Sequence, residues 1–141
     1  MAVGGRVIIN RQALNELLYG RTGPVARMLE HQAERVTQEA KRLAPVSPVG
    51  EQDHPSGQLR SSIGWDLTHD GRQLVAEVRA ETDYALYVEV GTRPHDITSH
   101  GDYPLRNPKT GAVFGRTVHH PGTKAQPYLR PSLDVIRGRV D

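Results

Sequence analysis

Histidine is the residue type that most readily suggests a chemical site in this sequence. There are seven histidines, and four of them, His95, His100, His119 and His120, fall within residues 95–120. A zinc site needs three or four ligands that converge at about 2.0–2.1 Å. The spacing matches no local zinc motif such as His-Glu-x-x-His, and two adjacent histidines on a strand point to opposite faces. We therefore expect loop histidines that bond to the backbone, and no metal site.

A nucleophilic site is the second chemistry to consider. His119 could pair with Asp83 or Glu89 and with Ser132 as the nucleophile. However, the sequence has no nucleophile elbow, and no glycine-rich loop follows a strand to cradle a phosphate. Three lysines are also too few for a lysine-rich phosphate site. The sequence therefore predicts no catalytic residue and no cofactor, and we expect that the protein is not an enzyme.

Length and composition limit the remaining classes. At 141 residues the chain is most simply one domain, residues 1–141. A chain of this size buries roughly 70% of its unfolded surface without a disulfide or metal. The absence of cysteine excludes disulfides and thiolate chemistry. No run approaches the roughly 20 apolar residues of a membrane span, and Met1–Gly5 lacks the features of a signal peptide. We expect assembly in the cytoplasm and no membrane partner.

Two helices are predicted in the N-terminal third. Asn10 can cap a short helix over Arg11–Tyr19, and Gly20 can end it. A longer helix is predicted over Pro24–Leu43, because proline favours the first turn and Pro45 stops a continuation. The face of this helix that carries charged residues should be exposed, and its apolar stripe should lie in the core. The stripe consists of Val25, Leu29, Ala33, Val36, Ala40 and Leu43.

A β-hairpin is predicted in the middle of the chain. Residues 46–57 form a loop rich in proline, glycine and acids, and Ser56–Arg60 is typical of a short helical turn. Two alternating runs follow, as on strands with one buried face, and Asp70-Gly71 supplies the turn between them. The alternating apolar residues are Ile63, Trp65 and Leu67 on one strand and Leu74, Ala76 and Val78 on the other.

The last third combines a long insert with a terminal helix. Weak strands are predicted around Ile97, at residues 112–114 and at residues 117–119, within a glycine- and proline-rich segment over residues 95–120. We expect this segment and the loop at residues 46–57 to be flexible. A helix is predicted from about Pro127 to Arg137. The elements together predict an α+β fold, in which a small, twisted, mostly antiparallel sheet is packed by one long N-terminal helix and a C-terminal helix.

Two motif segments have residues that suit shape better than catalysis. The first runs from Tyr84 to His95, and its Gly91-Thr92 follows an apolar run as a helix stop does. Periodicity leaves Tyr84–Val90 open between a helix and a strand. The second runs from His119 to Leu133 and contains Pro121-Gly122, a turn signal.

Together with a third segment, these motifs resemble the tail-completion family of tailed bacteriophages, also called neck proteins or minor tail components. The third segment is Leu43-Ala44-Pro45-Val46 followed by Ser56-Gly57-Gln58-Leu59-Arg60-Ser61-Ser62-Ile63. The shared pattern elsewhere is Tyr-Ala-x-Tyr-Val-Glu-x-Gly-Thr, then an insert, then His-Pro-Gly-Thr-Lys-Ala-Gln-Pro-aromatic-Leu-Arg-Pro-x-Leu. The resemblance runs from about Val25 to about Ile136, and the loop has an insertion around Val49–His54. The family resemblance implies a helix at Tyr84–Val90.

The resemblance also implies a function. The protein would be a structural virion protein of the phage head–tail junction, assembled in the host bacterial cytoplasm. It would act by ring assembly, with a hexamer as the first expectation and a dodecamer as the second. Its neighbours would be a head–tail connector or stopper protein and a tail terminator or tail tube protein. Contact with passing DNA would be transient.

Charge and motif position suggest where subunits would meet. Residues 1–43 have net charge +3, residues 44–90 have −5 and residues 91–141 have +4. An acidic middle between basic ends is compatible with a head-to-tail contact, and equally with ordinary differences between exposed faces. The interface candidates are Tyr87, Glu89, Arg93, Thr123, Lys124, Gln126, Tyr128 and Arg130.

The alternative function is a small nucleic-acid-binding accessory protein, encoded for example by a prophage. The sequence pI of about 9.2 and the excess of arginine over lysine favour it. No basic helix or aromatic platform accompanies them, however. A gel shift with a strong salt dependence would distinguish this alternative from a structural role.

Overall fold

The structure is a computed structural model in which residues 8–46, 56–70, 73–108 and 110–138 are described. The chain divides into two compact units, which we describe separately. Unit 1 contains the residues up to Thr82 and those from Tyr128 onward, and unit 2 contains Asp83–Pro127. Most of the predicted loop at residues 46–57, and Gly71 of the predicted hairpin turn, lie outside the described residues. The prediction of a single domain stays a prediction.

Both predicted N-terminal helices are confirmed. Helix α1 spans Arg11–Tyr19, and the Asn10 side chain accepts a hydrogen bond from the Ala13 N–H at 3.1 Å, as an N-cap does. Helix α2 spans Pro24–Leu43. The predicted stripe on α2 is buried only in its middle. Its members Ala33, Val36 and Ala40 are buried, Val25, Leu29 and Leu43 are partly exposed, and Ala26 and Thr37 are buried although they were not in the predicted stripe.

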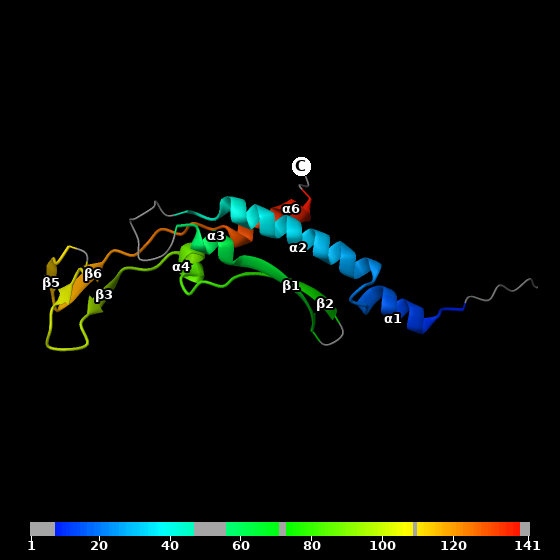
Figure 1. The fold of residues 1–141 in the computed structure, drawn as a ribbon, viewed down its shortest axis with the longest axis horizontal. Helices are drawn as coiled ribbons and strands as arrows, with labels where there is room; N and C mark the ends of the chain where they lie inside the picture. The colour runs from blue at the N-terminus through cyan, green and yellow to red at the C-terminus, as the bar shows by residue number, and fades with distance from the viewer. Residues whose placement is uncertain (1–7, 47–55, 71–72, 109, 139–141) are drawn as a thin grey trace, which may run out of the picture. The chain divides into compact units, whose positions relative to one another are not determined.

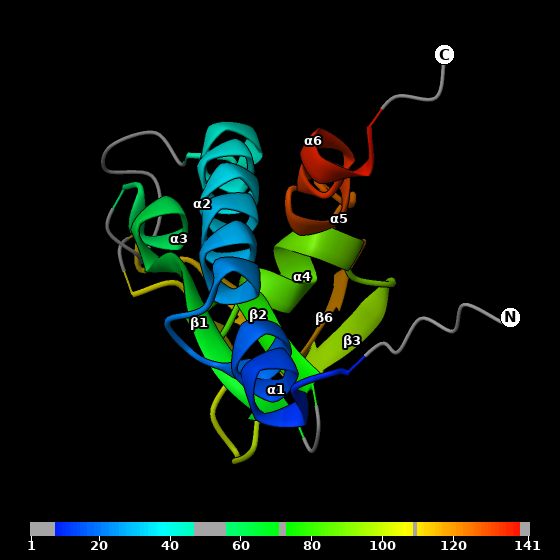
Figure 2. The same ribbon diagram turned by 90° about the vertical axis from the view of Figure 1, so that its right-hand side faces the viewer.

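The predicted hairpin is also confirmed. Helix α3 (Gln58–Ser62) leads directly into strand β1 (Ile63–Asp70), which pairs antiparallel with β2 (Gln73–Ala80). The predicted apolar residues of both strands lie on the face toward α2, where Ile63 is fully buried, and Val75 lies on the other face. Figure 1 shows α2 running along the hairpin, and Figure 2 shows α3 on one side of α2 with α5 and α6 on the other. Unit 1 therefore has one core, between α2 and the hairpin.

The predicted C-terminal helix is broken into two short ones. Helix α5 spans Leu129–Ser132 and helix α6 spans Asp134–Arg137. Pro131 has no backbone N–H to donate, and the Leu133 N–H bonds to the Arg130 carbonyl only three residues back, at 3.2 Å. This tight turn interrupts the helix, which also begins two residues later than predicted. Both short helices pack on α2.

The described residues of unit 2 form one helix and two antiparallel pairs of short strands. Helix α4 spans Ala85–Val90, so the helix that the family resemblance favoured is confirmed. The predicted weak strands are found as β3 (His95–Thr98), β5 (Val113–Gly115) and β6 (Thr117–His120). Strand β4 (Leu105–Arg106) was not predicted, because two residues are too few to show a period.

The strands do not form one sheet. In the described part of the chain, β1–β2, β3–β6 and β4–β5 are three separate two-stranded antiparallel sheets. The α+β class, the antiparallel pairing and the long packing helix are as predicted. The division of the sheet was not foreseen, because strand periodicity shows which face is buried but not which strand is the neighbour.

Candidate interaction surfaces

The two motif segments meet in unit 2 through Thr92 and Thr123. The Thr92 N–H donates to the Thr123 carbonyl at 3.0 Å, and the Thr123 N–H donates to the Thr92 carbonyl at 3.1 Å. The two hydroxyl oxygens lie 3.0 Å apart. Nearby, the Gln126 N–H donates to the Val88 carbonyl at 2.8 Å. These bonds, which we call the motif contact, join backbone segments about 30 residues apart in sequence.

Two glycines make the motif contact possible. Gly91 and Gly122 both have positive φ, at 73° and 83°. A Cβ built on Gly91 would lie 2.5 Å from the Thr123 carbonyl oxygen, and one built on Gly122 would overlap the Thr92 carbonyl oxygen. Any other residue would be strained at these angles and would push the segments apart. The Gly-Thr and Pro-Gly-Thr motifs therefore have a structural role in this protein.

Three histidines of unit 2, His95, His119 and His120, have local partners. His95 and His120 lie opposite each other on β3 and β6, with ring centroids 5.1 Å apart. On the other face of this pair of strands, His119 Nδ1 lies 2.8 Å from Asp96 Oδ1. The Gly122 N–H donates to His120 Nδ1 at 3.0 Å. Among the described residues, no cluster of three or more His, Asp or Glu side chains could hold a metal ion.

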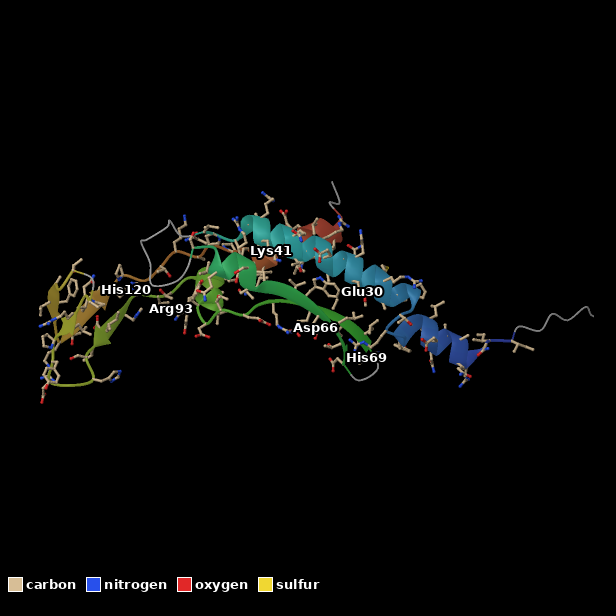
Figure 3. The ribbon with its side chains drawn as sticks, in the orientation of Figure 1. Glu30, Lys41, Asp66, His69, Arg93 and His120 are labelled. Carbon is tan, nitrogen blue, oxygen red and sulfur yellow. The ribbon has the colours of Figure 1, made fainter. Side chains whose placement is uncertain are left out.

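An apolar surface lies on α4. The side chains of Leu86, Tyr87 and Val90 are exposed although they belong to a helix. With Arg93 and Pro94 they line an open hollow of about 580 Å³ in unit 2. Figure 3 labels Arg93 and His120, which lie on the two segments joined next to the motif contact. The bond from the Gln126 N–H to the Val88 carbonyl attaches α4 to the second motif segment.

A second apolar surface lies in unit 1, between α2, β2 and the two C-terminal helices. It is a groove of about 260 Å³, which we call the α2–α6 groove. It is lined by Leu29, Gln32, Ala33, Val36, Ala76, Val78, Leu129, Arg130, Leu133 and Ile136. Its only charged lining residue among those described is Arg130.

The hairpin has an acidic face on the side away from α2. Asp66 lies there (Figure 3), and it is directly opposite Glu77 on the neighbouring strand. Like charges directly opposite each other destabilise a hairpin. Asp66 and Glu77 are two of the eight acidic residues within residues 44–90.

The predicted interface residues have different positions in the structure. Six are exposed: Tyr87, Arg93, Thr123, Lys124, Gln126 and Arg130. Glu89 and Tyr128 are buried within the chain, at 8% and 0% exposure. The structure brings Thr123 and Gln126 into the motif contact and places Tyr87 and Arg93 beside the α4 hollow. Whether any of the eight contacts another subunit stays a prediction.

One surface was missed. Helix α1 has no buried residue, and its leucines are exposed. The spacing of Leu14, Leu17 and Leu18 shows an apolar stripe that is visible in the sequence.

No described helix is long and apolar enough to cross a membrane.

The fold and surfaces define a small α+β protein in which the Gly-Thr and Pro-Gly-Thr motifs join two segments of its own backbone. Residues 24–91 match the family model described as "Bacteriophage HK97-gp10, putative tail-component". The matched residues run from the first residue of α2 to the glycine that ends α4, just under half of the chain, and over them the chain is similar to this family. The resemblance found in the sequence is thus confirmed for this region. Neither a search of curated proteins nor a search of solved structures gave a match.

Proposed function

We propose that this protein is a structural, non-enzymatic component of the phage head–tail junction that completes the tail or joins it to the capsid. The match of residues 24–91 to a family of phage tail components is the observation that carries this proposal. The C-terminal motif at residues 119–133, which lies outside the matched region, supports the narrower tail-completion role by its resemblance to that family.

The proposed mechanism is assembly of identical subunits into a ring, with a hexamer first and a dodecamer second. The exposed apolar residues of α1 and α4 support it, because large apolar groups on the surface of a small protein commonly mark interaction sites. The ring would dock to a connector or stopper protein on one side and to a tail terminator or tail tube protein on the other. Its contact with passing DNA would be transient, since tight phosphate neutralisation would oppose passage.

Particle assembly tests the proposal. The gene would be deleted from the phage that encodes it, and the lysate examined by electron microscopy with and without wild-type protein supplied from a plasmid. We expect filled heads and tails that remain unjoined, and infectious particles restored by the plasmid. Normal joined particles in the deletion lysate would contradict the proposal.

A further inference from the structure

We infer that the open edge of strand β2 binds a short segment from a second copy of this chain as an added antiparallel strand. The segment is the run Arg6-Val7-Ile8-Ile9, which we call the N-terminal run. The acceptor is the edge of β2 that does not face β1, which we call the β2 edge. This inference rests on the self-assembly in the proposed function and names the surfaces that would carry it.

Backbone polar groups of the hairpin point outward on both of its edges. In an antiparallel pair, alternate residues bond across the pair, and those between them direct N–H and C=O groups away from the partner strand. Leu67 is of the second kind, because its N–H donates to Asp66 Oδ1 at 2.9 Å and its carbonyl accepts from Arg21 Nη2 at 2.8 Å. The register places Ala76 opposite Leu67. The backbone groups of Ala76, and of Val78 two residues further on, therefore point outward at the β2 edge.

The two edges of the hairpin differ in how these groups are satisfied. On β1, both polar groups of Leu67 have partners within the chain. On β2, no described residue hydrogen-bonds to the outward groups of Ala76 and Val78. An open edge of this kind is a template for pairing with another strand. The β2 edge is therefore the side of the hairpin to which a third strand can add.

The surroundings of the β2 edge specify the side chains of such a strand. Ala76 and Val78 line the α2–α6 groove together with aliphatic residues of α2 and the C-terminal helices. A strand added beside β2 would direct alternate side chains into this groove and the others over the outer face of the hairpin. On that outer face lie Val75 and Glu77, and Glu77 is opposite Asp66. The edge therefore suits a strand that is aliphatic toward the groove and carries a cation on its other face.

The N-terminal run meets these requirements in one antiparallel register. Placing Ile8 opposite Val75 makes an aliphatic pair on the outer face. Arg6 is then opposite Glu77, and Val7, between the two pairs, faces the groove. Cross-strand pairs of both kinds stabilise strand pairing. Among the described residues, neither Glu77 nor the carboxylate opposite it has an ion pair, so an added cation would offset the repulsion between them.

The donor segment must come from another subunit. Ile8 and Ile9 are 78% and 67% exposed in their own chain, and Asn10 after them caps α1. Helix α1 is about 13 Å long, and its other end, Tyr19, lies beside His69 on the hairpin. Figures 1 and 2 show α1 extending from there to beyond the hairpin. The two isoleucines are therefore held away from the β2 edge of their own subunit.

Donor and acceptor are different surfaces of the same subunit. A contact between two different surfaces of identical subunits is head-to-tail, and it closes into a ring when the rotation fits. Pairing of β2 with β2 of another copy would instead be isologous and would stop at a dimer. The strand contact is thus of the kind that the proposed ring requires.

Disulfide trapping between two single-cysteine variants tests the register. The chain has no cysteine, so full-length Ile8→Cys and Val75→Cys proteins can form a mixed disulfide only between subunits. Residues directly opposite on neighbouring strands are close enough for a disulfide. We expect oxidation of the equimolar mixture to give this mixed disulfide as the main linked product, identified by mass spectrometry. Circular dichroism and the fluorescence of the single tryptophan show that each variant is folded.

The matched control replaces Val75→Cys with Ala76→Cys. Because successive side chains of a strand point to opposite faces, the yield of mixed disulfide with Ile8→Cys should fall about ten-fold or more. Equal yields from the two mixtures would overturn the inference, as would the absence of a mixed disulfide from both.

A charge swap tests the pairing of Arg6 with Glu77. Adding Glu77→Arg to the Val75→Cys protein should lower the yield of mixed disulfide about three-fold, because exposed ion pairs are weak. Adding Arg6→Glu to the Ile8→Cys protein as well should restore the yield. A yield that the second change lowers further would overturn the register.

Hydrogen exchange of the wild type covers the case in which a variant fails to fold. In dilute free protein, the outward amides of Ala76 and Val78 should exchange faster than those of Val75 and Glu77, which bond to β1. In oligomers, exchange at Ala76 and Val78 should slow about ten-fold or more, while Val75 and Glu77 serve as internal controls and change little. Unchanged exchange at Ala76 and Val78, or a wild type that stays monomeric in sedimentation velocity, would overturn the inference.

Failure of this contact can be distinguished from failure of the proposed function. A deletion lysate with unjoined heads and tails, together with no mixed disulfide, would overturn only the strand contact. Joined particles in the deletion lysate would contradict the junction role itself.

Discussion

The indole Nε1 of Trp65 on β1 donates a hydrogen bond to Glu34 Oε2 on α2 at 2.9 Å. The other carboxylate oxygen of Glu34 accepts a bond from Gln38 Nε2 at 2.7 Å. The hydrogen bonds from Gln38 and from Trp65 lower the pKa of Glu34 below its ordinary value of 4.5. Glu34 therefore links the hairpin to the helix in its charged form.

The Glu34 link should make stability depend on pH. A carboxyl whose pKa is lowered by folding stabilises the native state above its unfolded pKa, and this contribution is lost as pH falls through the folded pKa. We expect Glu34→Gln to reduce the loss of stability between about pH 5 and pH 3. Urea unfolding at several pH values, followed by Trp65 fluorescence, measures this change in stability. Glu30→Gln, one turn earlier on α2, is the control and should follow the wild-type profile; the same profile for Glu34→Gln would contradict the link.

The motif contact should depend on Gly122 for space as well as for φ. Gly122→Ala places a Cβ against the Thr92 carbonyl, whereas Gly115→Ala, at φ 89°, meets no atom within 4 Å. Both variants have the left-handed strain of about 1–2 kcal/mol, so their difference isolates the close approach. We expect hydrogen-exchange protection of the Thr92 and Thr123 amides to fall about ten-fold or more in Gly122→Ala alone. Equal protection in the two variants would contradict the prediction, because it would show that the backbone shifts to accommodate the added methyl group.

Ile63 should carry much of the stability of unit 1. Its side chain is 2% exposed, while that of Ile8 is 78% exposed, so the same substitution can be compared at both. Ile63→Ala should lower the free energy of unfolding by about 2–5 kcal/mol, through lost burial and a cavity. Ile8→Ala should change it by less than about 0.5 kcal/mol. Chemical denaturation at low protein concentration measures the free energy of unfolding of both variants. Similar losses in the two variants would show that Ile63 is not part of the core.

Removing the hydroxyl of Thr37 should leave the stability of the protein unchanged or raise it. It is buried on α2, and its Oγ1 has no hydrogen-bond partner among the described residues. Thr37→Val keeps the branched shape and removes a polar group that is buried without a partner, so we expect it to be neutral or stabilising by up to about 1 kcal/mol. The control Thr98→Val is on an exposed strand and should change little. A clearly destabilised Thr37→Val would reveal a bond to this hydroxyl.

Residues 95–120 should open more readily than α2. All four residues of β3 and all three of β5 are exposed, so their hydrogen bonds have little apolar cover. We expect faster amide exchange there than over Val25–Leu43 in the free protein. Exchange as slow as in α2 would contradict the prediction that this segment is flexible.

The sequence by itself determined the elements whose signals are local. Asn10 and Gly20 delimit α1, Pro24 starts α2, and strict alternation defines the hairpin, because capping and periodicity act between residues a few positions apart. The same reasoning failed for the C-terminal helix, where the apolar spacing suggested continuity, whereas the chain makes a tight three-residue turn at Leu133.

Only the tertiary structure decided what each of these elements contacts. Gly91 and Gly122 could be identified as turn or helix-end residues, but not as two points where separate backbone segments touch. Tyr128 and Glu89, chosen from the sequence as contact residues, are buried. The stripe on α1 is visible in the sequence, yet its exposure is not. An amphipathic pattern indicates that one face of a helix is apolar. Whether that face is buried depends on which distant segment of the chain covers it.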